Sequence, residues 1–98
     1  MAAQLIVCIQ GQLQNVFDAL YEMGVIDPVL QMDWSGPIRK MDENSFQVRR
    51  AVELVNQNSG EPKQLRATLE KMDRQTLEWI AIAVAKEYAE FHSRQGLH

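Results

Sequence analysis

The sequence has few of the side chains on which catalysis and metal binding depend. Its 98 residues include one cysteine, Cys8, and two histidines, which excludes an internal disulfide and leaves too few ligands for a structural zinc site. Cys8 lies in the most apolar run of the chain, where a thiol is expected to be buried and unreactive. The five glycines are scattered singly, so no phosphate-binding loop is present. We therefore predict no enzyme activity, no metal and no cofactor.

The first third of the chain also lacks positive charge, because no lysine or arginine occurs before Arg39. A secretory signal needs a basic start, so this pattern predicts a cytoplasmic protein. No apolar run approaches the ~20 residues that a membrane helix needs, and we expect no membrane partner. The net charge of −3 makes nucleic acid an unlikely partner.

What the chain does have is helical periodicity, which is clearest over residues 73–95. Asp73 is suited to cap the start of this helix through its carboxylate. Apolar residues recur at intervals of three and four, which predicts one apolar face. This face comprises Leu77, Ile80, Val84, Tyr88 and Phe91.

Similar patterns predict further helices over residues 3–23, 46–58 and 62–72. Two shorter stretches remain between them: a short helix capped by Asp27, and residues 38–44, which fit either one helical turn or a loop after the break at residues 35–37. Leu5 to Ile9 also fit a short buried strand. The expected fold is all-α: a single domain over residues 1–98, forming a compact bundle of four to five helices with a central C-terminal helix.

The first predicted helix has an unusual polar composition. No charged side chain occurs from Met1 to Phe17, and the polar positions there are amides such as Gln10 and Gln14. Depletion of charge is typical of the centre of a protein interface. One hypothesis is that residues 1–24 dock on another protein or form a homo-oligomer, such as a homodimer. The alternative is a packed helix with a neutral outer face.

Two further features are candidates for partner binding. Trp34 stands beside the break at residues 35–37, and tryptophan is enriched at binding hot spots, although a lone tryptophan also suits a core. Four basic residues fall within twelve positions, and they fit an acidic partner, a phosphate or a solvated face. They are Arg39, Lys40, Arg49 and Arg50.

These observations favour a small non-enzymatic protein–protein interaction protein that acts as an inhibitor, adaptor or accessory subunit of a larger protein complex. Small acidic helical proteins are common among phage-encoded inhibitors of bacterial defence systems, an association with size and class alone. The alternative is a nucleic-acid-binding helical regulator that uses the basic 39–50 segment. A third class is a ligand carrier whose apolar pocket is lined by Met23, Met32, Met41 and Met72.

Overall fold

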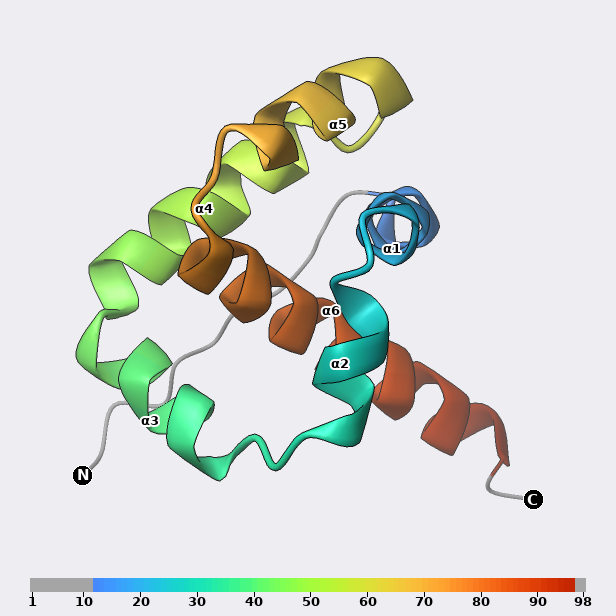
Figure 1. The fold of residues 1–98 in the computed structure, drawn as a ribbon. Coiled ribbons are helices and arrows are strands. Elements are labelled where there is room, and N and C mark those ends of the chain that lie inside the picture. The colour runs from blue at the N-terminus through green and yellow to red at the C-terminus, as the bar shows by residue number, and fades with distance from the viewer. Residues whose placement is uncertain (1–11, 97–98) are drawn as a thin grey trace.

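The computed structural model describes residues 12–96, with side chains over residues 12–89, and this part of the chain is all helical. The predicted fold class is thus confirmed, with six helices rather than four or five (Figure 1). The radius of gyration of 13.0 Å is that of a compact chain of this length. The helices are α1 (Leu13–Glu22), α2 (Ile26–Gln31), α3 (Ser35–Glu43), α4 (Ser45–Asn58), α5 (Pro62–Glu70) and α6 (Arg74–Gly96).

The additional helix is α3, which begins where the sequence suggested a break. Ser35 is its first residue, and the Asp33 carboxylate accepts hydrogen bonds from the Ser35 backbone N–H (3.1 Å) and hydroxyl (3.0 Å). Pro37 lies in the first turn, where a backbone N–H has no partner within the helix, so a proline is tolerated there. The prediction of a break was therefore wrong.

The other helix starts follow the sequence only in part. Asp73 accepts a hydrogen bond from the Thr76 N–H (2.8 Å) at the start of α6, and Pro62 opens α5, both as predicted. Asp27 was expected to cap α2, but this helix already begins at Ile26 and has no side-chain cap. The predicted start near Ser45 is close, since Ser45 is itself the first residue of α4.

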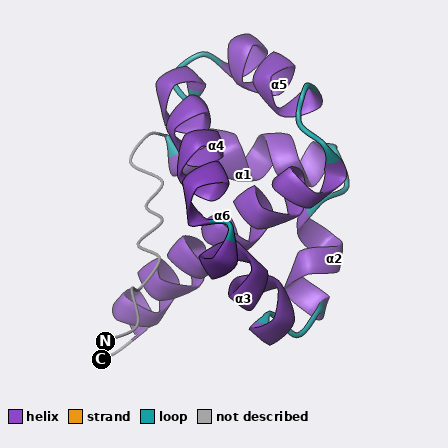
Figure 2. Cartoon of the chain, turned by 90° about the vertical axis from the view of Figure 1, so that its left-hand side faces the viewer, coloured by secondary structure: helices purple, strands orange, loops and turns teal. Residues whose placement is uncertain are grey.

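The middle of α6 is buried on every side. All seven residues from Trp79 to Ala85 are buried, and α6 contacts α1, α2, α3 and α4. A helix that is apolar all round is one that other elements enclose, so the prediction of a single apolar face was wrong for this stretch. Both views show the first part of α6 among the other helices and its end extending away from them (Figures 1 and 2).

The other helices each bury one side against this core. Every one of α1 to α5 contributes buried apolar residues. Their fully buried members include Val16, Leu20, Ile26, Val48, Val55, Leu65 and Leu69. The four methionines of the proposed ligand pocket belong to this packing as well, since Met41 is buried and the other three pack against the core.

A buried hydroxyl joins the start of α1 to the turn after α4. Ser59 is 2% exposed, and its Oγ accepts a hydrogen bond from the backbone N–H of Gln12 (3.1 Å) while donating one to the Asn56 carbonyl (3.0 Å). The Asn15 side chain donates to the Ser59 carbonyl (3.0 Å). These bonds link positions 44 and 47 residues apart, so they hold the start of α1 against the turn after α4.

Candidate functional site

Four large apolar side chains of the described residues remain exposed, and two of them lie on α4. The exposed fraction is 76% for Phe46 and 42% for Leu54. Arg50 stands midway between them, and the spacing of four places all three on one side of the helix. We call Phe46, Arg50 and Leu54 the α4 stripe.

The α4 stripe borders an apolar groove of about 200 Å³ between α4 and the junction of α5 with α6. Among the described residues that line this groove, Arg50 is the one that carries a charge. A mostly apolar surface with one arginine resembles the centre of protein interfaces in composition. The lining residues are Phe46, Gln47, Arg50, Ala51, Leu54, Met72 and Thr76.

The position of Phe46 follows from the face that α4 buries. Val48, Val52 and Val55 are buried, and a helix advances by roughly 100° per residue. Phe46 therefore points almost directly away from the core, into solvent. Single exposed apolar residues are common on protein surfaces, so Phe46 is a candidate for binding because Leu54 and the apolar groove lie beside it.

A second exposed surface lies on α1. Gln14, Asp18 and Tyr21 are all exposed and share one side of the helix, and we call them the α1 stripe. Gln14 Nε2 donates a hydrogen bond to an Asp18 carboxylate oxygen (2.9 Å). The ring of Tyr21 stacks on Phe17 with centroids 6.4 Å apart, and Phe17 in turn stacks on Tyr88 at 4.7 Å. Of the two predicted contact residues in this region, Gln14 is on the surface and Gln10 lies outside the described residues.

Trp34 has a clear role within the fold. It is half-buried and packs against the core, and its indole N–H donates to the Val29 carbonyl over 2.6 Å. This bond ties the loop after α2 back onto α2 itself. The indole N–H is therefore already engaged within the fold.

The four predicted basic residues do not share one site. Arg39 and Lys40 line a groove between α3 and the start of α6, whereas Arg50 lines the α4 groove. Arg74 lines the first groove as well, together with Glu43 and Glu78, so this groove is mixed in charge and its two acids would weaken the binding of a phosphate backbone. Among the described residues, the ion pairs are instead made by Arg66. It pairs with Glu22, which connects α5 to α1, and with Glu70 within α5.

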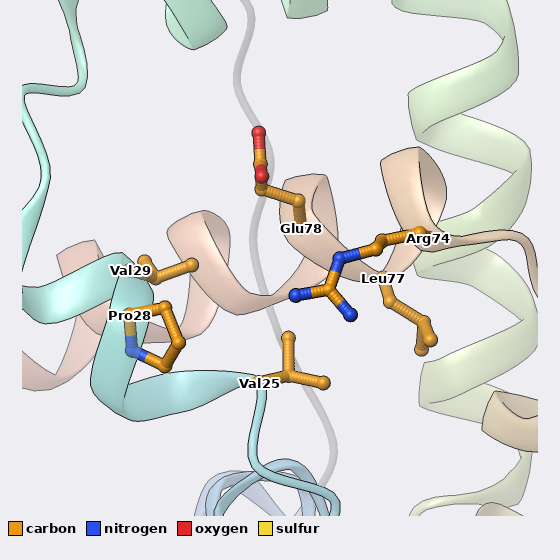
Figure 3. Close-up of a pocket in the computed structure, with 6 residues that line it drawn as sticks. All are labelled: Val25, Pro28, Val29, Arg74, Leu77 and Glu78. Atoms are coloured by element: carbon orange, nitrogen blue, oxygen red, sulfur yellow. The ribbon is translucent and has the colours of Figure 1, made fainter.

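A smaller pocket of about 140 Å³ lies between α2 and the start of α6 (Figure 3). Its apolar lining comes from Val25, Pro28, Val29 and Leu77. Figure 3 shows the Arg74 guanidinium extending across it toward α2. Arg74 is exposed, so water competes with any ligand for this cation.

The titratable groups with shifted pKa values stabilise helix starts. Hydrogen bonds from the Ser35 backbone and side chain lower the pKa of Asp33, and hydrogen bonds from the Thr76 side chain and backbone lower that of Asp73. Both carboxylates are exposed. Within the described part of the chain, no three histidine, cysteine or acidic residues are grouped to hold a metal ion.

Among the described helices, none combines the length and apolar character needed to cross a bilayer. Protein-family models, curated proteins and solved structures provide no match to this chain.

Proposed function

We propose that this chain is a small non-enzymatic protein–protein interaction protein that docks through the α4 stripe and its groove. In this role it acts on a larger protein as an inhibitor, adaptor or accessory subunit. The observation that carries the proposal is Phe46, which is 76% exposed at the edge of an apolar groove. Burying such a side chain on binding contributes about 1.5–3 kcal/mol.

The fold suits a rigid presentation of this surface. We place α6 as the central helix of the bundle, since its buried run contacts four other helices including α4. A close-packed interior has low compressibility, so the backbone of α4 holds its outer face in a defined position. A preformed surface loses less entropy on binding than a flexible one.

The two carboxylates with shifted pKa values have structural roles. Asp33 and Asp73 have lowered pKa values because they accept hydrogen bonds at the beginnings of α3 and α6. A general base for chemistry near neutral pH needs the opposite shift, toward 7. These two carboxylates therefore serve local structure.

The test compares capture of host proteins by the tagged wild type, Phe46→Ser and Leu30→Ser. Leu30 is a matched control because it is 53% exposed on α2, away from the α4 groove. We expect a protein that wild type and Leu30→Ser retain and that Phe46→Ser retains about 10- to 100-fold more weakly. Equal retention by all three chains, with each folded by circular dichroism, would overturn the proposal.

A further inference from the structure

The order of apolar and basic side chains along the α4 stripe indicates what kind of surface can bind to it. Phe46, Arg50 and Leu54 give apolar, basic and apolar positions over ~12 Å of helix. Among the described residues, Arg50 makes no ion pair, and the two ion pairs present are both made by Arg66. A complementary surface must therefore bring a carboxylate to the middle of the contact and less polar groups to either side.

The α4 helix of a second copy is a poor partner for the α4 stripe. If two α4 helices packed antiparallel and centred on their stripes, the two Arg50 guanidinium groups would meet at the two-fold axis. Like charges so placed repel each other. The position of Arg50 at the midpoint thus disfavours pairing of α4 with itself.

The α1 stripe matches this pattern at its centre and at one end. Asp18 lies between Gln14 and Tyr21, and the three span ~10 Å, close to the length of the α4 stripe. Tyr21 is 57% exposed and offers an aromatic surface, while Gln14 holds the Asp18 carboxylate in place. A carboxylate accepts several hydrogen bonds, so Asp18 can receive an arginine as well.

The charge of the surrounding surface agrees with this match. Residues 12–38 contain four acids and no lysine or arginine, and three of these acids lie on α1 and α2. Glu22 pairs with Arg66 of α5, whereas Asp18 and Asp27 make no ion pair within the described residues. Lys63 and Arg66 line the same groove as Asp18, so the unpaired negative charge is local to the α1 stripe. On α4, Arg49 and Arg50 stand together on the exposed side. Opposite charges on the two surfaces favour approach in the matching orientation.

Resting on the proposed role of the α4 stripe as a docking surface, we propose that a second copy of this chain occupies the stripe when no larger protein does, and that this copy docks through its α1 stripe with Asp18 facing Arg50. Because the residues of both stripes are exposed in one copy, the contact forms between copies. Each stripe covers about two helical turns, a small area that fits weak association in the micromolar to millimolar range.

The test reverses the two central charges separately and then combines the variants. The measurement is sedimentation velocity over concentrations up to about 1 mM, where a weak contact is populated. We expect the mean mass of the wild type to rise with concentration, and Asp18→Arg and Arg50→Asp to stay monomeric. An equimolar mixture of both variants should associate again, because their introduced charges face each other and the native Asp18 and Arg50 still do.

The controls separate this contact from loss of folding and from general charge effects. Lys86→Asp reverses a charge at an exposed position of α6 that lines neither the α4 groove nor the groove beside Asp18, and it should associate like the wild type. Circular dichroism establishes that each variant is folded. A wild type that is monomeric throughout, variants that associate normally, or a mixture that stays monomeric would overturn the proposal.

The two proposals fail in different ways. If the wild type is monomeric and Phe46→Ser still loses a captured protein, α4 binds a different partner and only the second copy is excluded. If the charge-swapped mixture associates while capture is unaffected by Phe46→Ser, the contact between copies stands and docking on a larger protein does not.

Discussion

The helices α6 and α4 use their surfaces in opposite ways. Over the seven residues from Trp79 to Ala85, α6 leaves no side to solvent. By contrast, α4 buries Val48, Val52 and Val55 on one side and exposes Phe46 on the other. One helix therefore completes the interior, while the other has apolar side chains that the single copy leaves in water.

This difference separates residues kept for stability from residues available for binding. A change within the buried run of α6 must be accommodated by close-packed neighbours, because α6 contacts four other helices. A change on the outer side of α4 alters few packed contacts, so we expect its effect in binding more than in stability. Substitutions that compare the two classes test this division directly.

The largest effect is expected from Val84→Asp. Val84 has no exposed surface, and an unpaired charge at this position costs about 5 kcal/mol, which is comparable with the whole stability of a small domain. Thermal unfolding followed by circular dichroism should show little or no native structure. Lys86→Asp, two residues further on an exposed position, is the control and should melt near the wild type. A Val84→Asp chain with an unchanged Tm would mean that α6 is not enclosed.

A smaller effect is expected from leucine truncation on the two kinds of surface. Leu69 is fully buried, so Leu69→Ala should lower the free energy of unfolding by about 2–5 kcal/mol. Leu54→Ala, at a position 42% exposed, should lower it by less than about 1 kcal/mol. Urea denaturation measures both values. Equal losses would place Leu54 in the core and remove it from the binding surface.

The smallest effect is expected from Asp73→Ala, which removes the acceptor of the Thr76 N–H at the start of α6. Hydrogen bonding lowers the pKa of Asp73 in the folded chain, so its stabilisation is present above the unfolded value of 3.8 and is lost as pH falls through the lower folded value. The variant should therefore melt below the wild type at pH 7. This gap in Tm should narrow as pH falls below 3.8 and close below the lower folded value, and a gap that stayed constant over this range would assign the effect to something other than the charge.

Much of the helix pattern was predictable because its signals are local. Apolar spacing identified α4, α5 and α6, and Asp73 and Pro62 marked two of the starts. Residues 35–37 were misread because Ser-Gly-Pro usually interrupts a helix, whereas a proline in the first turn is tolerated. The enclosure of α6 depends on which helices surround it, and no local pattern contains that information.

The candidate surface was predictable only in part. Gln14 and Arg50 were identified from charge and composition, and both lie on exposed helix faces. Phe46 was missed, although it stands two residues before Val48 and therefore falls on the opposite side of α4. Exposure of a phenylalanine becomes informative once the buried side of its helix is known.

The Ser59 hydroxyl has a consequence for the order of events during synthesis. The backbone N–H of Gln12 is made 47 residues before the oxygen that accepts its hydrogen bond. At ordinary translation rates this interval lasts roughly 2 to 9 s. Through that time α2 is made beside α1, whereas its other neighbours, α5 and α6, are made only after Ser59. The bonds to the turn after α4 can therefore position α1 before these later helices arrive.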